Sequence, residues 1–125
     1  MGTNAAVIEG AYAAFAGGDI PAVIDLVDDN VEWSSPATLP QGGQFHGKAG
    51  VGNFFQAVGS AWSELKLNVE SVSEAGAELV IGVVRADGTL RDGGPSGYGA
   101  THVFTVRSGK VARFREYVDL DGPVH

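Results

Sequence analysis

Apolar side chains recur every three or four residues in three parts of the chain: 4–18, 19–27 and 47–62. This spacing places them on one face of an amphipathic helix. Thr3 or Asn4 can cap the start of the first helix. Asp19 can cap the second, which has Pro21 in its first turn and Val27 on its apolar side. The pattern therefore predicts three helices.

After Trp62 the apolar residues alternate or form short runs, which predicts four strands: 65–73, 78–90, 98–106 and 111–119. A short strand is also expected at Val31–Trp33, followed by a loop over 34–44, which is rich in proline, serine and glycine. This order of elements is typical of an α+β fold, in which three helices cover one face of a mostly antiparallel sheet. We expect a single domain over residues 1–125.

Two ionisable residues stand on the apolar face of the last two predicted strands. His102 alternates in step with Phe104, and Glu116 in step with Phe114. A turn centred on residues 108–109 with four residues in its loop would create three opposite pairs: His102–Glu116, Phe104–Phe114 and Val106–Ala112. A shift of one residue would instead place Arg115 opposite His102. The matching of aromatic residues favours the first register.

A histidine–carboxylate pair in apolar surroundings is a candidate general acid/base unit, because burial and pairing change pKa values. The alternative is a structural pair at the open end of the sheet. The pattern of His102 and Glu116 alone favours neither interpretation.

The net charge of the chain is −7, and its eight basic residues are scattered. Proteins that bind nucleic acids or anionic membranes need clustered basic residues, so neither kind of partner is expected. The chain has no cysteine, and its three histidines lack the spacing of a metal site. Neither a signal peptide nor a membrane-spanning segment is visible, so a cytoplasmic location is expected.

Several other residues have both a structural and a functional interpretation. Four aromatic residues lie in apolar patterns, where a place in the core is more common than a ligand contact: Tyr12, Trp33, Phe54 and Trp62. Arg85 and Asp87 would share one sheet face, where solvated surface is the usual explanation. Asp119 follows the last strand and can equally be a turn residue.

Three stretches of the chain occur in the order found in a known family: "AYAAFAGGDIPAVIDLVDDNVEW", "FHGKAGVGNFF" and "HVFTVRSGKVARFREYVD". Over nearly its whole length the chain resembles the SnoaL-like family of the ketosteroid-isomerase/nuclear-transport-factor-like superfamily. The resemblance implies a cone, in which a curved antiparallel sheet wraps three helices and leaves an apolar pocket open at one end. It also implies a homodimer without a cofactor. Family members include isomerases, polyketide cyclases and epoxide hydrolases, so the fold does not settle the reaction.

Against the steroid isomerases of this superfamily, Tyr12 matches the tyrosine that hydrogen-bonds the substrate carbonyl. His102 matches an acid that donates to the same oxygen, and Phe54 matches a pocket phenylalanine. Trp33 stands where those enzymes have a proton-shuttling aspartate. Because tryptophan cannot carry that proton, the resemblance argues against steroid isomerisation itself.

Against the limonene-epoxide hydrolases, "FREYVDL" is similar to their "WRDYFDL". Phe114 then matches a pocket tryptophan, and Glu116 matches the catalytic acid/base aspartate. Ser34 matches a water-holding asparagine, and Arg85 with Asp87 resembles an Arg-x-Asp pair. The resemblance therefore leaves epoxide hydrolysis open.

Taken together, the pattern and the resemblance predict a small-molecule-binding protein, acting as a cofactor-independent isomerase or cyclase on an apolar cyclic or polyketide-like substrate. The expected catalytic residues are Tyr12, His102, Glu116 and Asp119. The expected substrate-binding residues are Trp33, Ser34, Phe54, Trp62, Arg85, Asp87, Phe104, Phe114 and Val118. An epoxide hydrolase and a non-catalytic ligand-binding dimer are the alternatives.

Overall fold

The computed structural model describes residues 3–119 and contains three helices: α1 (Asn4–Ala16), α2 (Ile20–Asp25) and α3 (Gly47–Ala61). As predicted, polar side chains cap the first two. The Thr3 hydroxyl accepts a hydrogen bond from the N–H of Ala6, and the Asp19 carboxylate accepts one from the N–H of Ala22. Within residues 3–119, no helix has the length and hydropathy that crossing a bilayer requires.

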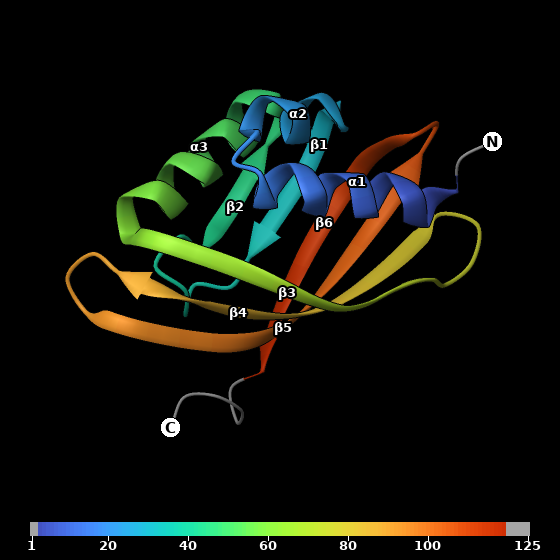
Figure 1. Ribbon diagram of the computed structural model, residues 1–125. Helices are drawn as coiled ribbons and strands as arrows, with labels where there is room; N and C mark the ends of the chain where they lie inside the picture. The colour runs from blue at the N-terminus through green and yellow to red at the C-terminus, as the bar shows by residue number, and fades with distance from the viewer. Residues whose placement is uncertain (1–2, 120–125) are drawn as a thin grey trace.

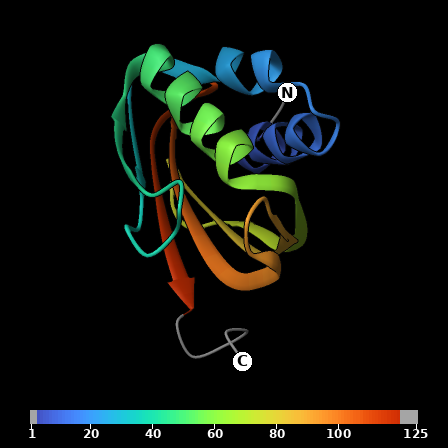
Figure 2. The same ribbon diagram turned by 90° about the vertical axis from the view of Figure 1, so that its left-hand side faces the viewer.

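The strands form one six-stranded sheet: β1 (Val27–Ser35), β2 (Gly43–His46), β3 (Trp62–Glu74), β4 (Leu79–Leu90), β5 (Gly94–Arg107) and β6 (Lys110–Asp119). Their order is β2-β1-β6-β5-β4-β3, and every neighbouring pair is antiparallel except β1 and β6. The sheet curves, and the helices gather on its concave side (Figure 1). Figure 2 shows the same arrangement from the side, with α3 and α1 lying over the bend of the sheet. The predicted α+β fold with a curved, mostly antiparallel sheet is confirmed.

Two sequence predictions about elements are wrong. Val27 belongs to β1 and not to the second helix, because its backbone pairs with Val111 of β6. Gly43 and Gln44, expected to end the loop over 34–44, instead begin strand β2. There Phe45 lies opposite Trp33 and packs edge-on against Phe54, with 5.5 Å between ring centroids. These contacts with other elements stabilise a strand that, at four residues, is too short to show in the pattern.

A tight turn joins β5 to β6. Ser108 and Gly109 both have positive φ, 52° and 77°, as a two-residue type I′ hairpin requires. The short loop pairs Val106 with Val111, so the expected pairing of Val106 with Ala112 is wrong. Ala112 has no partner and forms a β-bulge, which shifts the following register by one residue.

Because of this bulge, the rest of the hairpin has the register predicted from the aromatic matching. His102 lies opposite Glu116, and Phe104 lies opposite Phe114. The two phenylalanine rings are in contact, with 5.1 Å between centroids. The hairpin therefore places a histidine and a carboxylate side by side on the inner face of the sheet.

The core fills the space between the helices and this inner face. Along β4 and β5, buried residues alternate with partly exposed ones, as expected for strands with one covered face. The fully buried side chains include Ile8 of α1, Val51 of α3 and Val80 of β4. The helices thus pack against the concave side of the sheet through these buried side chains.

Candidate functional site

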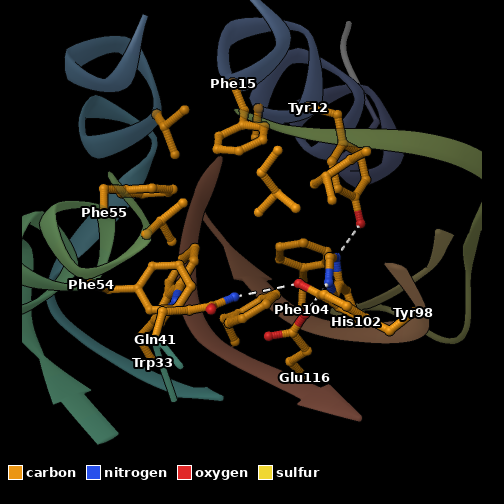
Figure 3. Close-up of a pocket in the computed structure, with 16 residues that line it drawn as sticks. Tyr12, Phe15, Trp33, Gln41, Phe54, Phe55, Tyr98, His102, Phe104 and Glu116 are labelled. Carbon is orange, nitrogen blue, oxygen red and sulfur yellow. Dashed lines mark hydrogen bonds and ion pairs between the residues drawn. The ribbon is translucent and has the colours of Figure 1, made fainter. Parts of the chain in front are cut away.

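A pocket lies between the helices and the inner face of the sheet (Figure 3). Its volume is about 70 Å³, which is room for a few water molecules or a small organic group. Its lining is largely apolar and includes eight aromatic side chains: Tyr12, Phe15, Trp33, Phe54, Phe55, Tyr98, Phe104 and Phe114. Among the described residues that line it there is no lysine or arginine, and Glu116 is the carboxylate.

On one side of the pocket, four polar side chains form a hydrogen-bonded chain. Tyr12 Oη lies 2.8 Å from His102 Nδ1, and His102 Nε2 lies 3.1 Å from Glu116 Oε2. Ser35 Oγ donates to Glu116 Oε1 over 2.6 Å. The side chains of His102 and Glu116 are each 6% exposed, so water screens their interaction only weakly.

Four elements of the fold, α1, β1, β5 and β6, supply these hydrogen-bonded side chains. The β5–β6 register supplies His102 and Glu116, and β1, parallel to β6, brings Ser35 next to Glu116. Tyr12 reaches down from α1, and its ring stacks on that of His102 with 5.9 Å between centroids. Phe114 contacts the same imidazole edge to face, with 5.0 Å between centroids. Aromatic packing therefore fixes the orientation of the imidazole.

The partners determine where the protons lie. An ionised Glu116 only accepts hydrogen bonds, so His102 donates from Nε2–H, and its Nδ1 accepts from the Tyr12 hydroxyl. When the His102–Glu116 pair holds one proton more, Nδ1–H can donate to the Tyr12 oxygen instead. The tyrosine O–H is then free to donate to another group. The hydrogen-bonded side chains of Tyr12, His102 and Glu116 thus have two arrangements that differ by one proton.

Two tyrosines near Glu116 are held in the protonated form. Burial raises the pKa of Tyr12 far above its ordinary value, and the negative charge of Glu116 raises it further. The same causes, in the same order, raise the pKa of Tyr98, while the hydrogen bond from Gln41 lowers it. Both phenols are therefore neutral hydrogen-bonding groups at physiological pH.

Tyr98 belongs to a second polar group that sequence reasoning missed. Trp62 Nε1–H donates to Gln41 Oε1 over 3.1 Å, and Gln41 Nε2–H donates to Tyr98 Oη over 3.4 Å. Tyr98 lies on the same face of β5 as His102, four residues earlier, so the strand pattern could have found it. Gln41 lies in an irregular segment, where no periodic signal exists.

The serine that reaches the site is Ser35, and the prediction of Ser34 is wrong. Side chains alternate along β1, where Val31, Trp33 and Ser35 are buried on the inner face. Ser34 therefore lies on the outer face, in a groove away from the pocket. The alternation from Trp33 already pointed to Ser35.

Arg85 and Asp87 do not line the pocket, so that prediction is also wrong. Their side chains are 38% and 52% exposed and form an ion pair over 3.3 Å. Their neighbours Val84 and Ala86 are the buried residues of this strand segment. Alternation along β4 places the pair on the outer face.

The other predicted residues divide into three groups. Four line the pocket: Trp33, Phe54, Phe104 and Phe114. Trp62 is buried and Val118 packs against the core, but neither lines the pocket. The side chain of Asp119 lies outside the part of the chain that the structure describes.

Charged side chains gather on the outer face of the sheet. A groove of about 320 Å³ between β1, β2 and β6 contains Arg113, Arg115 and Glu32. The pair Arg113–Glu32 is separated by 4.0 Å, and both side chains are more than half exposed. Within residues 3–119, no three histidine, aspartate or glutamate side chains are placed to hold a metal ion.

Solved structures with the same fold cover almost the whole chain. An NTF2-like protein from Burkholderia thailandensis E264 is 29% identical, with a TM-score of 0.87 over 95% of this chain and 92% of that chain. Bal32a, from a soil-derived mobile gene cassette, is 28% identical, with a TM-score of 0.82 over 92% and 88%. TerC, co-crystallised with polyporic acid, is 25% identical, with a TM-score of 0.81 over 93% and 91%.

No curated protein matches the chain significantly. The model of the SnoaL-like domain, in contrast, matches residues 8–114, which run from α1 into β6 and include Tyr12 and His102 but end before Glu116. With this match and the shared NTF2-like fold, the chain belongs to the SnoaL-like family of the ketosteroid-isomerase/nuclear-transport-factor-like superfamily.

Proposed function

We propose that the protein binds a small, neutral and largely apolar cyclic molecule and moves a proton within it, as a cofactor-independent isomerase or cyclase. The observation that carries this proposal is the buried chain of Tyr12, His102, Glu116 and Ser35 beside an aromatic pocket. Burying a carboxylate costs free energy that its partners only partly offset. Such pairs in clefts are candidates for acid/base chemistry.

The charge of the lining supports a neutral substrate. Glu116 is the carboxylate of the pocket, and no lysine or arginine among the described lining residues balances it. A carboxylate or phosphate on the ligand would be repelled at short range, where the apolar walls strengthen electrostatic interactions. Aromatic walls such as Phe54 and Phe104 favour flat or cyclic apolar groups.

The proposed reaction uses Glu116 as the base and the Tyr12 hydroxyl as a hydrogen-bond donor. Glu116 takes a proton from the carbon next to a carbonyl group, through an oxygen lone pair that neither Ser35 nor His102 occupies. Glu116 then carries that proton, His102 keeps its Nε2–H, and the Tyr12 O–H turns from His102 Nδ1 to donate to the enolate oxygen. Return of the proton to another carbon completes an isomerisation. Attack of the enolate carbon on a second carbonyl carbon of the molecule, whose oxygen takes the proton, completes a cyclisation.

A relative supports an organic ligand for this fold. TerC, 25% identical, was co-crystallised with polyporic acid. Epoxide hydrolysis is less well supported, because the Arg85–Asp87 pair that would assist it lies on the outer face. A non-catalytic ligand-binding protein remains the second candidate, since every ring nitrogen of His102 already has a protein partner.

A substrate screen tests the proposal. Neutral cyclic ketones and linear polyketones are compared with carboxylates of the same ring size and with terpene epoxides, by NMR detection of binding and of product. We expect binding and turnover of neutral ketones, and loss of turnover in Glu116→Gln and His102→Ala. Turnover that survives both substitutions contradicts the residue roles. Diol formation from the epoxides would favour the hydrolase, and binding without turnover would favour the non-catalytic protein.

We also propose that the protein is a homodimer that covers the outer face of the sheet. Ile81 and Val83 of β4 and Val103 of β5 are apolar and only partly exposed there, and Tyr117 of β6 is 52% exposed beside them. A second copy would remove this apolar strip from water. Native mass spectrometry should give twice the mass of the chain, and Val83→Lys should give the single mass. A wild-type monomer at micromolar concentration contradicts this assembly.

A further inference from the structure

Tyr12 has to cross one strand to reach its partner. Helix α1 packs against β3 and β4, whereas His102 lies on β5, the next strand along the sheet. The inner face of β4 carries valine at positions 80 and 84, both fully buried. Between them stands Gly82, whose register partner on β5 is His102. The tyrosine hydroxyl therefore passes over the one position between these valines that has no side chain.

The free space at Gly82 is the space that the Tyr12 hydroxyl occupies. A Cβ atom built on Gly82 would overlap Tyr12 Oη, and would lie 3.1 Å and 3.3 Å from the ring atoms Cζ and Cε2. The φ angle of Gly82 is not positive, so the backbone does not require glycine there. Glycine is needed there because any side chain would fill the space that the Tyr12 hydroxyl occupies.

We propose that Gly82 is the positioning residue of the site: by lacking a side chain, it lets the Tyr12 hydroxyl reach His102 and complete the hydrogen-bonded chain. An alanine would push the phenol away from Nδ1, where the separation is now 2.8 Å. The atom in conflict is the far end of a flexible side chain, so the tyrosine moves and the strand stays. An effect of Gly82 on turnover rests on the proposed function, whereas its effect on the Tyr12–His102 hydrogen bond does not.

The two explanations for this glycine differ in what else they predict. If Gly82 only allows close packing of α1 on the sheet, alanine disturbs the helix whether or not Tyr12 has its hydroxyl. If Gly82 acts through the hydroxyl, removing that one oxygen removes the severe overlap and leaves only the two tight ring contacts, which a small movement of the ring relieves. Phenylalanine at position 12 keeps the ring and loses the oxygen. A double-mutant cycle between the two positions therefore separates the explanations.

The experiment compares four proteins without any substrate: wild type, Gly82→Ala, Tyr12→Phe and the double variant, each with ¹⁵N-labelled histidine. The measured quantity is the ¹⁵N shift of His102 Nδ1, which reports whether this nitrogen accepts a hydrogen bond. We expect the two single variants to shift Nδ1 equally and in the same direction. The double variant should add nothing. A Gly82→Ala signal that equals wild type, or a double variant that shifts further, overturns the proposal.

Gly10→Ala is the matched control, because Gly10 lies two residues from Tyr12 in α1 and a Cβ there has no neighbour within 4 Å. Its His102 signals should equal those of wild type. If Gly82→Ala alone does not fold, the double variant should fold, since the overlapping oxygen is gone. Failure of both to fold contradicts the proposal.

With a substrate in hand, Gly82→Ala and Tyr12→Phe should lower kcat by the same factor. Absence of any turnover would count against the proposed function, while the NMR result would still test the role of Gly82.

Discussion

The two faces of the sheet each carry a proton-sharing or ionic pair at nearly the same separation. On the inner face, His102 and Glu116 are 3.1 Å apart, and each side chain is 6% exposed. On the outer face, Arg85 and Asp87 are 3.3 Å apart but 38% and 52% exposed. Distance therefore does not distinguish the pairs, whereas burial does. Exposed pairs contribute about 0–1 kcal/mol, while buried polar groups depend on each partner being present.

This difference explains why one pair is a candidate site and the other is surface. Water solvates Arg85 and Asp87 separately if their contact breaks, so neither needs the other. Glu116 has no such alternative, because Ser35 and His102 replace its water shell. Its unused lone pairs face a pocket from which water can be displaced by a ligand. The following predictions compare the two faces, in order of decreasing effect.

The largest difference in unfolding free energy should be between a buried apolar residue and an exposed charged residue on the same strand, β6. Phe114 is 4% exposed and contacts Trp33 with 4.1 Å between ring centroids, whereas its neighbour Arg113 is more than half exposed. Phe114→Ala should lower the free energy of unfolding by about 3–5 kcal/mol. Arg113→Ala should lower it by less than about 1 kcal/mol. Urea titration measures both, and equal losses would contradict the assignment of the two faces.

The next effect concerns the carboxylates themselves. Glu116→Ala leaves Ser35 and His102 without their buried acceptor, so we expect a loss of about 3 kcal/mol in unfolding free energy. Asp87→Ala breaks only an exposed pair and should cost less than about 1 kcal/mol. Matched urea titrations at neutral pH compare them. An Asp87 variant as unstable as the Glu116 variant would show that burial is not the deciding difference.

The smallest effect is a loss of stability at alkaline pH. The pKa values of Tyr12 and Tyr98 are raised in the folded protein, first by burial and then by Glu116. In the unfolded chain they ionise near the ordinary value of 10.0, so the unfolded state loses protons that the native state keeps. Stability should be full below that pH and fall above it. Urea titrations between about pH 9 and 11 should show a shallower fall in Tyr12→Phe and in Tyr98→Phe. An unchanged fall in both contradicts the cause given.

Period-two alternation predicts most of the inner face, because it depends only on which side of a strand a residue faces. It places His102, Glu116, Phe104 and Phe114 together, and the register of β5 and β6 confirms this. Alternation from Trp33 also points to Ser35, whereas the resemblance to the epoxide hydrolases points to Ser34. The resemblance places the serine one position too early, whereas the alternation of side chains along β1 gives the correct residue.

Other parts of the site leave no local signal. β2 forms because Phe45 pairs with Trp33 of β1 and packs on Phe54 of α3, so its stability depends on two other elements. Gln41 lies in an irregular segment and reaches Tyr98 only after the fold closes. The role of Gly82 depends on a tyrosine from a helix far away in the sequence. Tertiary packing decides such features, and a strand pattern cannot contain them.

The most direct test of the central claim is the rate of solvent deuterium exchange at the carbon next to the carbonyl of a ketone that the protein binds, measured by ¹H NMR for Glu116→Gln and Asp87→Asn. Each substitution removes one carboxylate charge with little change in shape, one on each face of the sheet. Because proton transfer by a positioned side chain contributes about 10²–10⁴-fold, Glu116→Gln should slow the exchange at least about 100-fold. Asp87→Asn should leave it at the wild-type rate. Equal rates in the two variants would contradict the claim that the buried chain of Tyr12, His102 and Glu116 moves the proton.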